Sequence, residues 1–397
     1  MTLLKKIAYV TTFFPLLIVL LLTGCENNPN DLGLTFINPN DTAGSKILDT
    51  TYISSNNYRR YINSNGSLNM LVGYTVLSGN QYYSRSLIQF SGIPGSYKDS
   101  TVVSASLRLK YSKYAYKDTT AAVAFNIYRV NKKFDLTQIT NDSVTSSDIG
   151  STSLGSYTGS PTNSNAINIT LDNQTMKDWL NYAADTNYSV KNYGLAFVPN
   201  SGSNTIKGFY SGFANDTLKP IITVVVRNGS SFDTLTFGNS TSASLSDAPL
   251  SVIPSSQYFI IQNGIAFRDI LKFNFSSQLP ANATINEAYL QLTLNSAQSY
   301  ITSGTSNQIK IDMVTDSSTK ASNDESFYLT RLDSITYTVR INQIVQRWIS
   351  GLTPNYGVVL KCPSEKINLD NFVFYGPDNT DFSRRPKLRI RYTPRQQ

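Results

Sequence analysis

An internal repeat constrains the fold of this chain more than any other feature of its sequence. Segment 85–90 (RSLIQF) parallels segment 268–273 (RDILKF), because each places an arginine before an apolar run that ends in phenylalanine. Segments 105–111 (ASLRLKY) and 288–294 (AYLQLTL) follow at the same spacing and alternate apolar with polar residues. Such alternation is typical of half-buried strands. The chain is therefore predicted to contain two copies of one β-rich module.

Each copy is also predicted to contain one short helix with a tryptophan on its buried face. The apolar positions with helical spacing are Met176, Trp179, Leu180 and Ala183 in the first copy, and Ile341, Ile344, Val345, Trp348 and Ile349 in the second. Spacings of three and four residues place these side chains on one face of a helix. The two tryptophans are therefore expected in the core rather than at a ligand.

The two copies close in the same way. An Asn-Tyr-Gly step follows each predicted helix, at 192–194 and 355–357. A basic residue and a proline then precede a last apolar strand in each copy. We assign structural roles to these prolines, Pro220 and Pro386.

The repeat predicts two tandem modules with a linker between them. Residues 228–247 are rich in Ser, Thr, Gly and Asn and lie between the two β-rich regions, which places the modules at 46–227 and 248–397. Many short strands, one helix in each copy and polar turns predict an all-β fold. We expect two tandem jelly-roll-like β-sandwiches, each with one short Trp-bearing helix, after an N-terminal signal and tether.

The N-terminus has the pattern of an export signal. Lys5 and Lys6 precede an apolar stretch that ends in small residues, as in secretory signals. Residues 22–25 (LTGC) resemble the bacterial lipobox, in which a peptidase cleaves before an acylated cysteine. This resemblance implies a lipoprotein signal peptide at 1–24 and acylation of Cys25. The alternative is a plain membrane-spanning anchor, for which the apolar stretch is short, because a span needs about 20 apolar residues.

Residues 25–45 are expected to form a lipidated polar tether, because they are rich in Asn, Asp, Pro and Gly. Acyl chains on Cys25 would attach the chain stably to a membrane, since two chains on one residue are enough. Glu26, rather than an aspartate, follows the cysteine. By resemblance to known sorting patterns, this favours the outer membrane. We therefore expect an exported protein that is lipid-anchored there.

The composition excludes several kinds of chemistry. The chain has no histidine, which excludes Ser-His-Asp and Cys-His catalysis and nearly all zinc and copper sites. We therefore expect no catalytic residue, metal site or cofactor. A structural calcium at an Asp/Asn-rich turn, such as 323–325 or 378–381, stays open because calcium takes oxygen ligands. The formal charge of +8 is dispersed and includes Lys5 and Lys6, which argues against a nucleic-acid partner.

In their order, these features resemble the DNRLRE-type module, a β-sandwich family also classed among carbohydrate-binding modules. The resemblance covers both halves of the chain. Its landmarks are Arg85, Phe90, Ala105, Leu107, Leu109, Trp179, Gly194 and Pro220, and then Arg268, Phe273, Ala288, Leu290, Leu292, Trp348, Gly357 and Pro386. The tethered lipoprotein start is similar to that of surface lipoproteins of Bacteroidetes-type bacteria. The family resemblance implies attachment to a polysaccharide.

Tyrosines are the first candidates for ligand contacts, because the C–H faces of sugars stack on exposed aromatic rings. If the apolar residues of segment 105–111 face the core, strand parity predicts that Tyr114 and Tyr116 point outward. Tyr82 and Tyr83 are further candidates. The alternative is that these tyrosines line the rim of the core with their hydroxyls outward, as amphipathic rings commonly do.

Arg85 and Arg268 occupy equivalent places in the repeat and have two interpretations. They either contact a ligand or pair with a carboxylate or with backbone carbonyls at the strand end, and we favour the second role. Cys362, which remains once Cys25 is acylated, lies in an apolar segment and is expected to be a buried small residue.

The sequence as a whole predicts a lipid-anchored, non-catalytic binding protein of the cell envelope that attaches to a polysaccharide or glycoconjugate. One alternative is a structural or adhesive lipoprotein that docks an envelope protein. A weaker alternative is a polysaccharide lyase or hydrolase. Glycosidases need two carboxylates that face one another across a cleft, and no pattern in the sequence pairs such residues.

Overall fold

The computed structural model describes residues 45–50, 53–77, 79–163, 165–252, 255–275, 278–302 and 306–394. The predicted signal peptide, Cys25 and all but the last residue of the predicted tether lie outside these ranges. The described chain consists of two β-sheets with two α-helices, α3 (Asn173–Ala184) and α4 (Asn342–Ile349). The all-β class and both helices are therefore confirmed, while the jelly-roll-like arrangement stays a prediction. Within the described ranges, neither helix has the length and apolar character that a membrane crossing requires.

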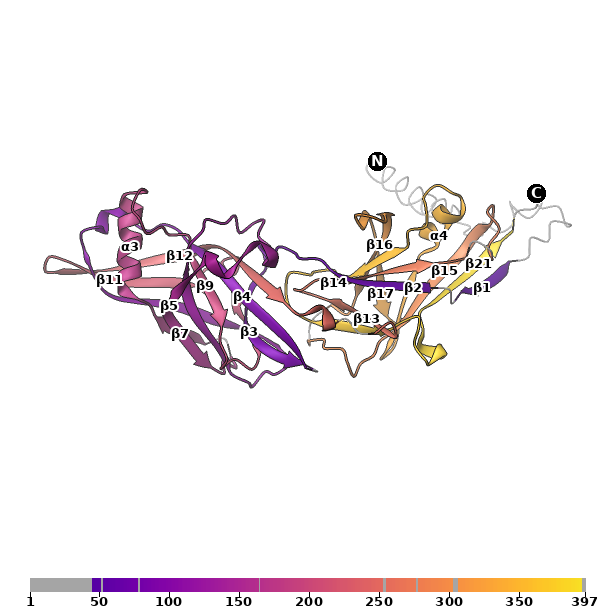
Figure 1. Ribbon diagram of the computed structural model, residues 1–397, viewed down its shortest axis with the longest axis horizontal. Helices are drawn as coiled ribbons and strands as arrows, with labels where there is room; N and C mark the ends of the chain where they lie inside the picture. The colour runs from indigo at the N-terminus through magenta and orange to yellow at the C-terminus, as the bar shows by residue number, and fades with distance from the viewer. Residues whose placement is uncertain are drawn as a thin grey trace, which may run out of the picture.

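The first sheet has ten strands (Figure 1). In spatial order they are β12 (Ser231–Asp247), β11 (Ile221–Asn228), β5 (Thr101–Tyr116), β10 (Ile206–Tyr210), β3 (Asn69–Leu77), β4 (Asn80–Phe90), β9 (Leu195–Pro199), β6 (Val123–Val130) and β7 (Ile149–Gly159), with β8 (Ala166–Thr170) paired to β5. The long strand β12 pairs with β11 in its first half and with β4 in its second half. The pairing therefore returns to β12 and surrounds one apolar core.

The second sheet has eleven strands. In spatial order they are β1 (Lys46–Thr50), β21 (Lys387–Thr393), β15 (Thr284–Thr293), β18 (Thr336–Arg340), β17 (Ala321–Arg331), β16 (Ile309–Asp316), β19 (Val358–Lys361), β14 (Phe267–Phe273), β13 (Tyr258–Gln262) and β20 (Asn371–Tyr375), with β2 (Ile53–Arg59) paired to β14. Its core contains Trp348 of α4 together with Leu290 and Leu292 of β15.

The sheets divide the chain differently from the predicted boundaries of 46–227, 228–247 and 248–397. Strands β1 and β2 pair with β21 and β14, so the start of the predicted first module belongs to the second sheet. The predicted linker 228–247 is occupied almost entirely by β12, because its Ser- and Thr-rich sequence still alternates with buried residues such as Leu235 and Phe237. Composition alone therefore does not distinguish this strand from a linker.

The chain begins in the second sheet, forms the whole first sheet and then returns. We call residues 69–247 the inserted module, and residues 46–59 together with 258–393 the enclosing module. The two modules lie end to end along the long axis of the molecule, with β1 and β2 in line along the enclosing module (Figure 1). Arg59, at the end of β2, forms an ion pair with Asp247, at the end of β12, and donates to the carbonyl of Ala248 at 2.8 Å. This contact joins the two connections between the modules.

Candidate functional site

Three of the tyrosines predicted to contact a ligand lie instead where the two modules meet. Tyr82, Tyr114 and Tyr116 belong to an apolar cluster that contains residues of both sheets, such as Phe267 and Leu369. Their exposed fractions are 5%, 7% and 0%. Tyr114 and Tyr116 do point away from the core that Leu107, Leu109 and Tyr111 face, but their predicted exposure is wrong, because the enclosing module covers them. Tyr82 borders a hollow of about 460 Å³ together with Tyr300.

Side-chain alternation is kept along β5, although the strand is irregular at Lys113. This residue has a positive φ of 67°, and the register between β5 and β10 shifts at the same place. Phe209 of β10 faces Tyr111, and Lys207, two residues earlier, faces Ala115, so Tyr111 and Ala115 lie on the same face of the sheet. Tyr114 and Tyr116 lie on the opposite face, which residues of the enclosing module cover. Alternation predicts the face but not this cover, because the covering residues are distant in the sequence.

Hydrogen bonds accompany the apolar contacts between the modules. The hydroxyl of Tyr114 accepts a bond from the backbone N–H of Leu369 at 2.9 Å and donates to Oδ1 of Asp370 at 3.3 Å. Tyr300 Oη, from the enclosing module, donates to the carbonyl of Ala115 at 3.1 Å. Burial, with the nearby charge of Asp370, raises the pKa of Tyr114 well above its ordinary value, so the hydroxyl stays neutral. These contacts favour a fixed arrangement of the two modules.

The two equivalent arginines have protein partners. Arg268 donates from Nε and Nη2 to the two carboxylate oxygens of Glu365, at 2.7 and 2.6 Å, and both side chains are largely buried. Arg85 donates from Nη2 to the carbonyl of Val144 at 2.7 Å. Arg268 therefore pairs with a carboxylate, and Arg85 with a backbone carbonyl. These are the structural roles that we favoured from the sequence. Neither arginine points into the pocket described below.

Among the described residues, the other tyrosine, tryptophan, proline and cysteine candidates that the sequence singled out are half-buried or buried. Tyr83 is half-buried on β4 and lines, with Tyr74 and Asp247, a hollow of about 520 Å³. Trp179 and Trp348 are buried in the two main cores. Pro220 and Pro386 are also buried, each just before the last strand of its repeat copy, and Cys362 is a buried free thiol.

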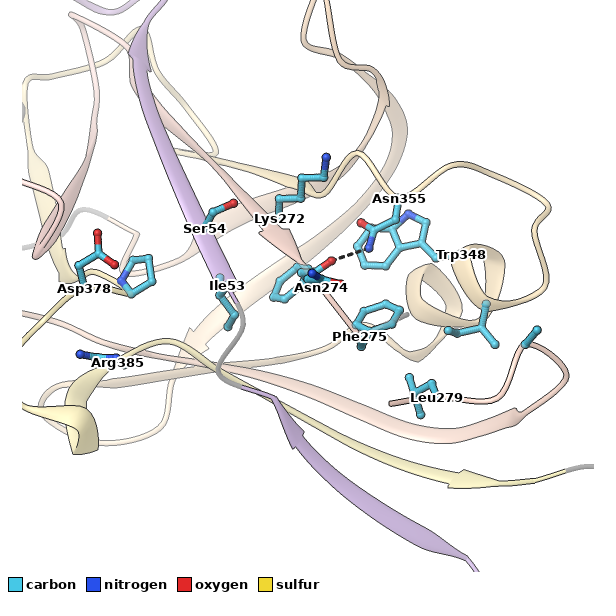
Figure 2. A pocket seen from close by; sticks show the side chains of 14 residues that line it. Ile53, Ser54, Lys272, Asn274, Phe275, Leu279, Trp348, Asn355, Asp378 and Arg385 are labelled. Carbon is cyan, nitrogen blue, oxygen red and sulfur yellow. Dashed lines mark hydrogen bonds between the residues drawn. The ribbon is translucent and has the colours of Figure 1, made fainter. Parts of the chain in front are cut away.

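A pocket of about 970 Å³ lies on the enclosing module, and the sequence contains no local sign of it (Figure 2). Its apolar floor contains Trp348 of α4 with Phe273 and Phe275 at the end of β14. The ring of Trp348 lies 5.9 Å from that of Phe273 and 6.2 Å from that of Phe275, measured between centroids. Ile53 of β2 and Leu279 complete the floor.

The rim of the pocket is polar and of mixed charge. Lys272 and Ser54 stand exposed on neighbouring strands, and Asp378 and Arg385 face them from the segment between β20 and β21 (Figure 2). Arg385 is held in place because its Nε donates to the carbonyl of Asn379 at 2.7 Å and its guanidinium lies over the ring of Phe382, 3.9 Å from the centroid. The pocket can therefore offer both an apolar surface and charged hydrogen-bonding groups to one ligand.

Chain segments far apart in the sequence form this pocket, which explains why local patterns do not predict it. Two rim residues belong to repeated patterns of the sequence, Lys272 to segment 268–273 and Asn355 to the Asn-Tyr-Gly step. The Nδ2 of Asn355 donates to the carbonyl of Phe273 at 2.8 Å. The segment that follows β4 in the inserted module corresponds to the one that follows β14 in the enclosing module. Its residues Ile93 and Tyr97 pack onto the core beside α3.

Among the described residues, no group of three or more His, Cys, Asp or Glu side chains is arranged to hold a metal ion. The two turns considered for calcium make other contacts. Glu325 pairs with Arg347 at 2.8 Å, and Asp381 accepts hydrogen bonds from Ser383. Asp378 is the one carboxylate among the described residues that line the pocket.

Comparison of the chain with protein-family models, with curated proteins and with solved structures yields no match. The resemblance to DNRLRE-type modules therefore stays a prediction. The functional conclusion depends on the geometry of the pocket and on the sequence.

Proposed function

We propose that this chain is a lipid-anchored, non-catalytic binding protein of the cell envelope, and that it holds a saccharide in the pocket over Trp348. The observation that supports a saccharide is a concave site whose rim carries amide, hydroxyl and charged groups above a floor of largely buried apolar side chains. Binding sites for small ligands are commonly concave and apolar, with a few polar groups that fix orientation. Sugars match such a site, because they present C–H faces and hydroxyls together.

The number of carboxylates that line the pocket supports binding of a saccharide rather than its cleavage. Glycosidases use two carboxyl groups about 5–10 Å apart on either side of the scissile bond. Asp378 is the single carboxylate among the described lining residues, and the cations Lys272 and Arg385 belong to the same rim. This set can bind hydroxyls and acidic groups without supplying a general acid and a general base.

An anchor at Cys25 would hold the enclosing module toward the membrane. The first described strand, β1, pairs with the last, β21, and both lie at the end of the molecule away from the inserted module (Figure 1). An extended chain of the length of the predicted tether spans at most about 70 Å. The inserted module would therefore project away from the membrane, and the pocket would lie between the membrane and the inserted module.

Binding of neutral and acidic oligosaccharides to the purified protein, measured by a glycan array and then by calorimetry, tests this proposal. The double variant Lys272→Gln/Asp378→Asn removes two exposed rim charges, and we expect it to weaken binding about tenfold or more, since hydrogen bonds to charged groups are the stronger ones. The matched control is Lys133→Gln/Asp99→Asn, which changes exposed residues of the inserted module. A folded protein that binds no glycan, or equal losses in the two variants, would count against the proposal.

A further inference from the structure

We propose that a second surface of the enclosing module binds an acidic polysaccharide, at a site separate from the Trp348 pocket. This surface is the outer face of β1, β21, β15 and β18, and we call it the basic face. Its defining residues are Lys387, Arg389, Arg391, Arg340 and Tyr289. The inference goes beyond the proposed function, because that function needs only the pocket.

Strand β21 presents three cations in a row. Leu388 and Ile390 point into the core, so Lys387, Arg389 and Arg391 point outward at every second position. Strand geometry places successive outward residues about 7 Å apart. The side chains of Arg389 and Arg391 are 63% and 50% exposed. The result is a linear row of positive charges, which is complementary to a linear polymer of negative charges.

An aromatic ring lies between two of the arginines. In the strand register, Tyr289 of β15 is directly opposite Arg389 of β21 on one side and Arg340 of β18 on the other. All three residues are exposed, and neighbouring strands lie about 4.8 Å apart. A sugar ring could therefore stack on Tyr289 while its acidic substituents reach a guanidinium on either side.

Two carboxylates share this face and leave an excess of positive charge. Asp49 lies 3.4 Å from Nε of Arg389, and Glu287 lies 3.8 Å from Nη1 of Arg391. Four cations against two anions give a net charge of +2 on the basic face. Both pairs are well exposed, and exposed ion pairs contribute little, so a polyanion can compete for the arginines.

The polar character of the face favours a polysaccharide over an anionic membrane. The row beside Tyr289 consists of Lys387, Gln291 and Thr338, which are placed opposite one another by the strand register. Amide and hydroxyl groups next to cations suit the hydroxyls and carboxylates of a polyuronate. Stable contact with a bilayer commonly uses apolar residues that enter it. Among the described residues of this face, the exposed large apolar side chains are Ile47 and Tyr289, which lie on different strands.

Binding of polygalacturonate to the full chain, measured by calorimetry at two salt concentrations, tests the inference. We expect the native protein to bind polygalacturonate more weakly at the higher salt, because exposed charges are screened. The double variant Arg389→Gln/Arg391→Gln should lose about tenfold in affinity and part of the salt dependence. Tyr289→Ala should weaken binding and leave the salt dependence unchanged.

The matched control is Lys133→Gln/Arg227→Gln, which removes two exposed charges from the inserted module. Equal losses in the two double variants would show binding by net charge alone and would overturn the inference. Binding to vesicles that contain phosphatidylglycerol, without binding to polygalacturonate, would also overturn it and assign the face to the membrane. Binding of neutral glycans in the pocket should be the same in all these variants, so failure of the pocket proposal is seen separately.

Discussion

Asn355 donates a hydrogen bond from its side chain to the backbone carbonyl of Phe273 at 2.8 Å. Asn192 makes the same contact with the carbonyl of Phe90 at 3.1 Å. Each asparagine stands two residues before a glycine of positive φ that lies against the equivalent strand. The internal repeat is therefore a repeated set of contacts as well as a repeated pattern of residues.

The glycine of this step predicts a large loss of stability on substitution. Gly357 has a φ of 91°, and a Cβ there would lie 2.3 Å from the carbonyl oxygen of Leu271. We expect Gly357→Ala to lower the free energy of unfolding by about 3 kcal/mol, from backbone strain and the clash together. Gly351, with a φ of 70° and open space around it, is the control. Gly351→Ala should cost about 1 kcal/mol in the same denaturant titration, and equal costs would contradict the role of the carbonyl.

Asp269 predicts a stability that depends on pH. It is fully buried, and its Oδ1 accepts a hydrogen bond from the hydroxyl of Ser55 at 2.7 Å. Burial raises its pKa to about 7, although the Ser55 bond opposes this. The folded chain therefore keeps a proton that the unfolded chain releases, so stability is fully present below about pH 4 and is lost as the pH rises through 7. The loss is on the order of 4 kcal/mol.

Asp269→Asn should remove this dependence. Relative to the native chain, we expect the variant to gain stability as the pH of the denaturant titration rises from 4 to 8. Asp316 is a control of opposite sign, because hydrogen bonds from Ser318 and Thr319 lower its pKa to about 2. Relative to the native chain, Asp316→Asn should lose stability as the pH rises above about 2. If the free energies of unfolding of the native chain and of Asp269→Asn differ by a constant amount from about pH 4 to 8, Asp269 is not the source of the pH dependence.

The contact between the modules predicts a cost for removing one hydroxyl. Tyr114→Phe would leave the backbone N–H of Leu369 without its acceptor in a buried place. We expect a loss of about 2 kcal/mol in the free energy of unfolding. Tyr83→Phe, in a half-buried ring of the same module, should change it by less than about 1 kcal/mol. Similar values for the two variants would show that the bond to Leu369 contributes little.

The buried pair of Arg268 and Glu365 predicts strong coupling. Arg268→Ala would leave the carboxylate of Glu365 buried and unpaired, which commonly costs about 3–5 kcal/mol. The double variant Arg268→Ala/Glu365→Ala should be less destabilised than the sum of the two single variants. Thermal and chemical unfolding of all four proteins measures this difference. Additive losses would mean that the two side chains act independently.

Local patterns were sufficient for the all-β class, for both helices and for the burial of Trp179 and Trp348. Apolar periodicity specifies which face of a segment is buried, so these predictions needed no knowledge of distant partners. The assignment of β1 and β2 to the first module failed because their partners are distant in the sequence. Lys46, for example, pairs with Tyr392, and no local pattern indicates this pairing. The predicted exposure of Tyr114 failed for the same reason, because the face to which it points is covered by residues such as Leu369 that are distant in the sequence.

The pocket was beyond prediction for the same reason as the strand pairing. Ser54, Lys272 and Asp378 meet at its rim only after β2, β14 and the segment before β21 have been brought together. The repeated asparagine, Asn355, was visible as part of a motif, but its contact with Phe273 depends on the fold. Attachment to a polysaccharide was predicted by resemblance alone, and the candidate ligand residues that the sequence offered do not line this pocket.

The nesting of one module within the other sets an order in which the chain can fold. Strands β1 and β2 are synthesised first, yet their partners β21 and β14 come much later. Every strand of the inserted module lies within residues 69–247, so that sheet can be completed while the partners of β1 and β2 are still missing. Its completion brings Arg59 and Asp247 together and so shortens the loop that must close between β2 and β13. A completed inserted module would therefore lower the entropic cost of joining the two parts of the enclosing module.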